Sequence, residues 1–277
     1  YNSSDGALDD GVAQMVTNYQ ILQLVVPLAY QTGGFSIAVA PVVNYGALDS
    51  DWSAPGTGFG SEGAGVSPDI SLGANLGAAY QTGNLTIGAM YKSSIKMEYD
   101  GQPALNPDVV GPFGIEVDNR LDVPAEYGIG ASYVIGGKHT IAADVKNIAY
   151  GDTKGWEEFG WDDQTVIALG YQFDAGKWAL RAGYNYGKAP IENLDFATDP
   201  ANVPRNFFNN VAFPATVEQH VTVGGSYYFS KTLGLDLAFT YAPEEETTYD
   251  IPGFSADGEV TTKHSQTALT AGMTFKF

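Results

Sequence analysis

The most constraining feature of the chain is the alternation in its last strand-like segment. Leu269, Ala271, Met273 and Phe275 occupy every second position up to Phe277, and the residues between them are polar or small. Successive side chains of a β-strand point to opposite faces, so this pattern gives one face that is apolar to the last residue. A strand in a soluble sheet rarely leaves a terminal aromatic without a polar tail. The pattern therefore predicts a strand whose apolar face meets lipid.

Composition narrows the function classes without deciding the fold. The net charge of −19 argues against a nucleic-acid partner, because phosphate backbones require a basic face. The absence of cysteine excludes disulfides and cysteine-ligated metals. There is no run of about 18 apolar residues, so a membrane helix is excluded. A membrane barrel remains compatible with the slightly negative mean hydropathy, because its lipid-facing and inner residues alternate.

Strand-like segments recur along the chain and are joined alternately by tight turns and long loops. We predict eleven strands, at residues 18–30, 35–47, 69–81, 85–98, 120–135, 139–150, 163–173, 178–188, 217–229, 233–242 and 263–277. The long loops, which carry most of the acidic residues, are predicted at residues 48–68, 100–118, 151–162, 189–216 and 248–262. Short turns at one end and long loops at the other are typical of an outer-membrane barrel.

Aromatic residues support the membrane interpretation. One group lies beside the tight turns and a second lies toward the long loops, as expected for rings at the two membrane interfaces. The predicted fold is an all-β, transmembrane, antiparallel β-barrel with short periplasmic turns and long extracellular loops. We expect one domain over residues 1–277 in the bacterial outer membrane, with residues 1–17 as the end of an extracellular loop.

The number of predicted strands has a topological consequence. The first and last of the eleven strands run in the same direction, so they cannot close an antiparallel barrel, and single-chain bacterial barrels have even strand numbers. Either an odd number of strands is missing before residue 18, or one strand is miscounted.

Four ordered segments resemble the FadL-type transporters of the outer membrane, the OmpP1/FadL/TodX family. They are Arg120 to Gly130 (RLDVPAEYGIG), Trp161 to Val166 (WDDQTV), Leu180 to Gly187 (LRAGYNYG) and Phe213 to Gly225 (FPATVEQHVTVGG). The resemblance implies a fourteen-stranded barrel with an amino-terminal hatch, of which the chain carries the last eleven strands. It also implies passive uptake of hydrophobic compounds, either long-chain fatty acids or hydrocarbons. The partners would be such an apolar molecule, outer-membrane lipid and lipopolysaccharide.

Candidate ligand-binding residues fall into two groups. Apolar side chains in the long loops could capture an apolar molecule, although such residues often pack on their own loop. Cations on the inner face could pair with a ligand carboxylate, although charges inside a barrel more often pair with each other. The candidates are the aromatic residues Phe113, Phe207, Phe208 and Phe213 and the cations Arg181, Lys92 and Lys146. Arg181 is the first choice for a carboxylate, because its planar fork can hold both oxygens.

Enzymatic and metal-dependent functions have little support in the sequence. His220 and Glu218 share a strand face and could form an acid–base pair, but no G-x-S-x-G nucleophile motif accompanies them. The histidines lack metal-ligand spacing, and no cofactor is expected. The alternative to transport is a structural or adhesive outer-membrane barrel, or a component of an assembly.

Overall fold

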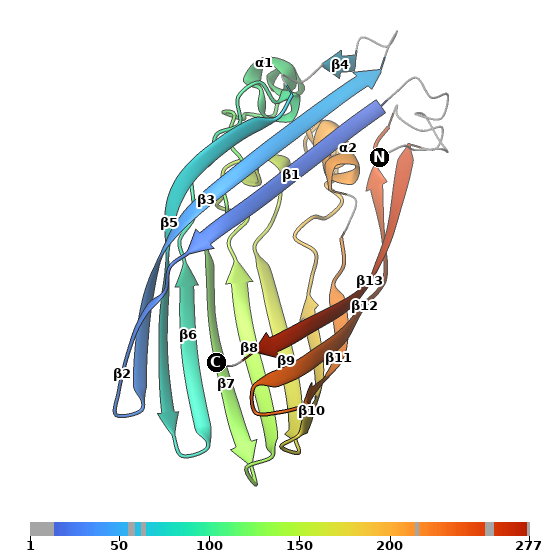
Figure 1. The fold of residues 1–277 in the computed structure, drawn as a ribbon. Helices are drawn as coiled ribbons and strands as arrows, with labels where there is room; N and C mark the ends of the chain where they lie inside the picture. Colours follow the sequence, from blue (N-terminus) through green and yellow to red (C-terminus); the bar gives the residue numbers. More distant parts are fainter. Residues whose placement is uncertain (1–13, 55–58, 62–64, 214–215, 253–257, 276–277) are drawn as a thin grey trace.

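The computed structural model describes residues 14–54, 59–61, 65–213, 216–252 and 258–275. All of its strands belong to one antiparallel sheet, which curves around an inner face (Figure 1). The strands of the first part are β1 (Gln14–Val25), β2 (Leu28–Thr32), β3 (Phe35–Ala54), β4 (Phe59–Ser61), β5 (Ser67–Thr82) and β6 (Leu85–Lys92). Those of the second part are β7 (Glu126–Ile135), β8 (His139–Ile148), β9 (Gln164–Asp174), β10 (Trp178–Gly187), β11 (Gln219–Tyr228), β12 (Leu233–Asp250) and β13 (Glu259–Phe275).

The order of strands confirms the predicted meander. Within the described residues the sheet runs β1-β3-β5-β6-β7-β8-β9-β10-β11-β12-β13, with β2 and β4 both paired to β3. Each neighbouring pair in this order is antiparallel, as an up-and-down barrel requires. The turns lie together at one end of the sheet, and the long connections lie at the other (Figure 1). We call these the turn end and the loop end.

The predicted strand 18–30 is divided into β1 and β2 at Val26 and Pro27, opposite Pro41 of β3. The register is continuous across the break, because Val25 pairs with Val42 and Leu28 pairs with Val39. At the break the Val26 N–H donates to the Pro41 carbonyl at 3.2 Å, but Pro41 has no N–H to donate in return. The two segments therefore form one strand with an interrupted hydrogen-bond ladder. This strand begins at Gln14, earlier than predicted, and residues 1–13 lie outside the described residues.

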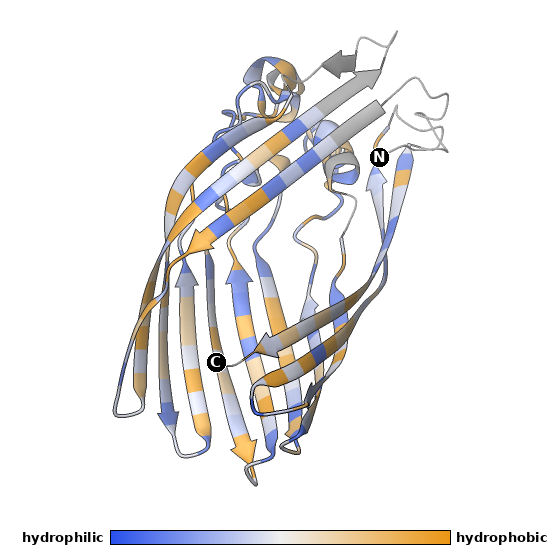
Figure 2. Cartoon of the chain, in the orientation of Figure 1, coloured by the Kyte–Doolittle hydropathy of each residue, from blue (hydrophilic) through white to orange (hydrophobic). Residues whose placement is uncertain are grey.

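The two faces of the sheet differ as the alternation predicted. The outer face carries exposed apolar side chains, among them Leu269, which is 79% exposed. Outer residues pair with outer residues across the ladder, for example Phe239 with Leu269 and Leu237 with Ala271. Figure 2 shows the resulting alternation of hydrophobic and hydrophilic bands along the strands. Such a surface is stable only against lipid, which is consistent with a membrane barrel.

Several predicted boundaries are wrong at the loop end. β3 continues to Ala54, and β12 and β13 pair as far as Asp250 and Glu259, so much of the predicted loops 48–68 and 248–262 is strand. In contrast, β6 ends at Lys92 and β7 starts only at Glu126. The residues between them, predicted partly as strand, fold inward as an irregular connection.

Short helices occur in these long connections and were not predicted. The β6–β7 connection contains η1 (Pro103–Leu105), α1 (Pro107–Val110) and η2 (Gly111–Phe113). The β8–β9 connection contains η3 (Glu157–Phe159), and the β10–β11 connection contains α2 (Asn202–Ala212). No helix within the described ranges is long and apolar enough to span a membrane.

The two edge strands of the sheet are β1 and β13. In the part of the chain that the structure describes, β1 pairs only with β3 and β13 pairs only with β12. The sheet therefore does not close on itself within these residues. The three further strands implied by the family resemblance stay a prediction.

Candidate functional site in the lumen

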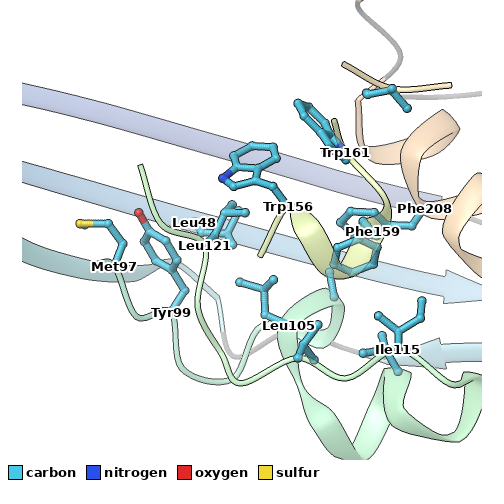
Figure 3. Close-up of a cluster of buried hydrophobic side chains, with 14 of the residues drawn as sticks. Leu48, Met97, Tyr99, Leu105, Ile115, Leu121, Trp156, Phe159, Trp161 and Phe208 are labelled. Atoms are coloured by element: carbon cyan, nitrogen blue, oxygen red, sulfur yellow. The ribbon is translucent and has the colours of Figure 1, made fainter. Parts of the chain in front are cut away.

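Three long connections fold back against the inner face at the loop end. They comprise residues 93–125, 149–163 and 188–213, and their apolar side chains form one buried cluster with Val42 and Leu48 of β3 (Figure 3). We call this cluster the loop core. Tyr99, Met97 and Phe159 are completely buried in it. Hydrophobic burial at this end of the sheet is thus supplied mainly by the loops, which pack on a few inward side chains of the strands.

Glycines in the wall make room for the first connection. A Cβ atom on Gly46 of β3 would lie 2.1 Å from Tyr99 Oη, and one on Gly73 of β5 would lie 2.6 Å from Ile95 Cδ1. The absence of side chains at these positions lets residues 95–99 lie directly on the wall. The start and the end of this connection pair with each other, since Ile95 and Val123 exchange backbone hydrogen bonds of 3.0 and 2.9 Å.

Aromatic rings occupy the centre of the loop core. The ring centroids of Trp156 and Trp161 are 4.4 Å apart, and Phe213 lies 5.3 and 5.1 Å from them. Tyr19 reaches in from β1 and makes edge contacts with Tyr99 and Trp156. Aromatic pairs in such arrangements add about 0.5–1.5 kcal/mol each to their area burial. The rings therefore join β1 to two separate connections.

Asp122 links the first two connections through polar contacts. Its carboxylate accepts hydrogen bonds from the Met97 N–H at 3.0 Å and from the Arg120 guanidinium, and this pairing raises the pKa of Arg120. Its backbone N–H donates to the Lys154 carbonyl at 3.0 Å, and its carbonyl accepts from Trp156 Nε1 at 2.7 Å. One buried residue thus joins the connection of residues 93–125 to that of residues 149–163.

Helix α2 attaches the third connection through asparagines. Asn209 accepts a hydrogen bond from Trp161 Nε1 at 3.0 Å and donates to the Phe159 carbonyl at 2.9 Å. Asn206 accepts from the Leu194 N–H at 2.9 Å and donates to the Asp250 carbonyl at 3.1 Å. Buried amides are stable only when both their oxygen and nitrogen are satisfied, as they are here. These contacts hold the helix across the mouth of the sheet.

Toward the turn end the inner face is open and lined by small side chains. A cavity of about 600 Å³ lies against β2, β3 and β5 to β8, and a second of about 320 Å³ lies against β10 to β13. An added Cβ on Gly77 or Gly170 would have no neighbour closer than 3.9 and 3.8 Å, respectively. Glycines therefore line the inner face at both ends, but only at the loop end do the long connections cover them.

The structure brings together two of the predicted cations. Lys92 Nζ and Lys146 Nζ each lie 3.0 Å from the Glu126 carboxylate, and all three residues are on the inner face. The cluster carries two positive charges and one negative charge. It lies near the strand ends that meet the loop core, and Lys146 also lines the larger cavity.

Arg181, the third predicted cation, lies elsewhere. Its Nε donates to Gln172 at 2.8 Å and its Nη1 donates to Ser226 at 2.6 Å, while Asp236 lies 4.0 Å away. The ladder places Lys146 level with Gly187, which is six residues farther along β10 than Arg181. At about 3.4 Å per residue, Arg181 is roughly 20 Å closer to the turn end. The structure therefore places the predicted cations at two levels.

The predicted loop aromatics lie at the loop end, but they differ in exposure. Phe208 stacks on Phe159 with centroids 3.7 Å apart, and Phe213 contacts both central tryptophans. Phe207 packs against the cluster from outside, and Phe113 is 41% exposed on η2. Phe208 and Phe213 therefore pack against a neighbouring connection and not only on their own loop.

Sequence reasoning missed several residues of this site. The central rings Tyr19, Tyr99, Trp156 and Trp161 and the asparagines of α2 were not among the candidates. Inward-facing glycines at positions 46 and 73 were a usable signal, because a glycine within a strand often marks a close approach of another segment. Nothing in the sequence identified which segment approaches.

The structure gives His220 and Glu218 separate partners. His220 Nδ1 is 3.0 Å from Asn185 Oδ1, whereas Glu218 accepts a hydrogen bond from the Ala189 N–H at 2.9 Å. Among the described residues, no group of three or more histidine, aspartate and glutamate side chains is placed to hold a metal ion.

Comparison with known proteins places the chain in a family. The family described as "Outer membrane protein transport protein (OMPP1/FadL/TodX)" matches residues 66–277. The chain belongs to this OMPP1/FadL/TodX family. Membership confirms the resemblance drawn from the four sequence segments, and it places the chain in the bacterial outer membrane as a multi-stranded barrel. Comparison with curated protein sequences gives no match.

Solved structures of OMPP1/FadL/TodX-type barrels share the fold. The toluene transporter TodX of Pseudomonas putida is 18% identical, with a TM-score of 0.60 over 94% of this chain and 70% of that one. A FadL homologue of Pseudomonas aeruginosa is 15% identical, with a TM-score of 0.62 over 94% and 69%. The monoaromatic hydrocarbon channel CymD is 16% identical, with a TM-score of 0.57 over 96% and 77%. At these identities the likeness establishes the fold alone.

Proposed function

We propose that this protein is a channel for passive uptake of apolar small molecules, with hydrocarbons or long-chain fatty acids as its substrates. Membership in an outer-membrane transport family indicates hydrophobic uptake at the family level. The observation that carries the proposal is the position of an aromatic loop core directly before a hollow inner face lined by small side chains. An apolar molecule could exchange one apolar environment for the other without crossing water.

The proposed path begins at the loop end. Phe113 is exposed on η2 and supplies an apolar contact for a molecule arriving from outside. Phe207, Phe208 and Phe213 continue this surface into the loop core, where Trp156 and Trp161 fill the space between the connections. Passage requires these rings to move, because Trp156 and Trp161 are buried and pack against each other with centroids 4.4 Å apart. The side chains of α2 and residues 149–163 are thus the proposed gate.

A carboxylate on the substrate would find its partner deeper in the lumen. Arg181 uses Nε and Nη1 for its hydrogen bonds to Gln172 and Ser226, and 42% of its side-chain surface is exposed. Its Nη2 has no partner among the described residues and is available to a ligand oxygen. Lys92 and Lys146 already share Glu126, so they would add a weaker attraction. We propose Arg181 as the main carboxylate-binding residue.

The test compares uptake of labelled oleate and labelled toluene by cells that lack their own transporter for either compound. Expression of the protein should increase uptake of at least one of them. Arg181→Gln should reduce oleate uptake about tenfold and leave toluene uptake unchanged, because a charge-assisted hydrogen bond to an anion is worth about 1.5–3 kcal/mol. Lys188→Gln is the matched control, since Lys188 is exposed in a loop and pairs with Glu192.

The alternative is a structural or adhesive barrel in which the loop core is a permanent seal. The complete burial of Tyr99, Met97 and Phe159 favours that alternative. If a correctly folded protein in the outer membrane gave no uptake of either compound above the background of the host, the transport proposal would be wrong and the structural role would replace it.

A further inference from the structure

Three neighbouring turns at the turn end each carry a lysine. They are Lys138 between β7 and β8, Lys177 between β9 and β10, and Lys231 between β11 and β12. All three side chains are exposed, and within the described residues no ion pair joins any of them to a carboxylate. The chain as a whole is acidic, with a net charge of −19, so a local group of unpaired cations requires a separate explanation. We call these three turns the basic arc.

The backbone holds the basic arc in a fixed arrangement. The Lys138 carbonyl accepts a hydrogen bond from the Asp174 N–H, and the Lys177 carbonyl accepts one from the Tyr228 N–H, both at 2.8 Å. Asp174, the acidic residue of the arc, accepts the Gly176 N–H at 2.7 Å and so stabilises its own turn. Adjacent hairpins are two strands apart, so the lysines are separated by about 10 Å along the rim. That spacing is comparable to the size of a lipid headgroup.

A row of outward-facing rings lies beside these lysines. His139 lies 4.9 Å from Phe173, Phe173 lies 5.4 Å from Trp178, and Tyr227 lies 5.0 Å from Phe229, all between ring centroids. Trp178 and Tyr227 are ladder partners, so the row continues from β8 to β11. The amphipathic rings of tryptophan and tyrosine, here Trp178 and Tyr227, sit at the level of lipid headgroups. The lysines therefore lie at the depth where lipid phosphates are found.

The remaining two turns provide an internal contrast. The turns between β2 and β3 and between β5 and β6 contain Gly33, Gly34, Gly83 and Asn84, and neither contains a lysine or arginine. Exposed rings are nevertheless present beside them, at Tyr30, Phe35 and Tyr80. The aromatic row thus extends beyond the cations, and among the described tight turns the lysines occur only in the three that connect strands β7 to β12.

We propose that the basic arc binds the headgroups of anionic phospholipids in the membrane leaflet that faces the turns. The ligand chemistry is a phosphate-bearing headgroup with net negative charge, such as phosphatidylglycerol or cardiolipin. The lysine stems lie along the aromatic row while their ammonium groups contact the phosphates. This inference concerns the outer surface and the turn end, so it is independent of the proposed transport function. Zwitterionic lipids provide no net charge for the arc and should bind less tightly.

The test measures lipid retention by the full-length protein in native mass spectrometry, with phosphatidylglycerol and phosphatidylethanolamine titrated separately. The variant carries Lys138→Gln, Lys177→Gln and Lys231→Gln together. The control carries Lys96→Gln, Lys188→Gln and Lys263→Gln, which removes the same charge from exposed residues of the loop end. Heat-dependent migration on gels checks that both proteins fold as the wild type does.

The wild-type protein should bind phosphatidylglycerol more tightly than phosphatidylethanolamine. The arc variant should lose on the order of tenfold or more of its affinity for phosphatidylglycerol, whereas the loop-end control should keep it. Equal losses in the two variants would show a general charge effect and overturn the proposal. Equal binding of both lipids by the wild-type protein would also overturn it.

Discussion

The loop end and the turn end of the inner face are made from the same strands, yet one is filled and the other is hollow. Gly46 and Gly73 at the loop end are covered by Tyr99 and Ile95, whereas a Cβ on Gly77, farther along β5, would meet only Ala38 at 3.9 Å. The difference lies outside the strands, in connections that are long enough to fold back at only one end. An inward glycine can therefore serve either as a docking surface or as the wall of a cavity.

The two ends also differ in what holds them together. At the turn end, tight hairpins and ladder hydrogen bonds connect strands that are neighbours in sequence. At the loop end, Asp122, Trp156 and Asn209 connect segments that are far apart in sequence. Long-range contacts of this kind can be lost while the ladder persists, because local opening costs less than global unfolding. The loop core should thus open at a lower free energy than the strand ladder of the turn end.

The largest expected effect comes from removing a central ring of the loop core. Trp156→Ala deletes a buried side chain and its hydrogen bond to the Asp122 carbonyl, which should destabilise the core by about 3–5 kcal/mol. Hydrogen exchange should show faster exchange in residues 93–125 and 149–163, with the strands of the turn end unchanged. Trp178→Ala, at an exposed outer ring, is the control. Faster exchange throughout the sheet would contradict the separation of the two ends.

The next largest effect tests the two faces instead of the two ends. Leu237→Arg places a charge on the outer face and should reduce the free energy of unfolding in lipid by about 2–4 kcal/mol. Ala238→Arg places the same side chain on the inner face, next to the smaller cavity, and should be tolerated. Denaturant unfolding in lipid vesicles measures both. Equal losses would mean that the assignment of faces along β12 is wrong.

Much of the sheet could be predicted because its determinants are local. The alternation of Leu237 and Phe239 with small or polar neighbours fixes both the strand and its orientation, and glycines such as Gly33 and Gly34, with φ of 54° and 81°, fix the turns. The number of strands on the main path and their order followed from these signals. Glycines with positive φ also occur in the turns between β5 and β6, between β7 and β8, and between β9 and β10.

The loop core could not be predicted because its determinants are distant in sequence. Nothing near Gly46 indicates that Tyr99 will lie against it, and nothing near Trp161 indicates that Asn209 will accept its hydrogen bond. For the same reason Lys92, Lys146 and Glu126 could each be placed on the inner face, but the pairing of both lysines with this one carboxylate could not be predicted. These contacts can be identified only when the register of the strands and the path of the connections are known.

A smaller and sharper test substitutes one glycine at each end. Gly46→Ala should destabilise the loop core by about 1–3 kcal/mol, because its Cβ would overlap Tyr99 and Met97. Gly77→Ala meets only Ala38 at 3.9 Å and should stabilise the strand by about 0.5–1 kcal/mol, since glycine weakens strand interiors. Thermal unfolding of both variants should thus give shifts of opposite sign. Shifts of the same sign would mean that both glycines face equivalent surroundings.

The prediction with the smallest effect at neutral pH concerns how the stability of the loop core changes at alkaline pH. Burial in the β6–β7 connection raises the pKa of Tyr99 to about 12 from an ordinary value of about 10. Because the folded protein holds this proton more tightly than the unfolded chain does, the stabilisation is complete below pH 10 and is lost as the pH rises toward 12. Tyr99→Phe should remove this part of the alkaline loss and one late-titrating tyrosine from the absorbance change. Tyr227→Phe, at the exposed turn end, should remove a tyrosine without altering the alkaline stability of the loop core. If the two variants had the same alkaline stability profile, Tyr99 would not be the group that links the filled end of the barrel to pH.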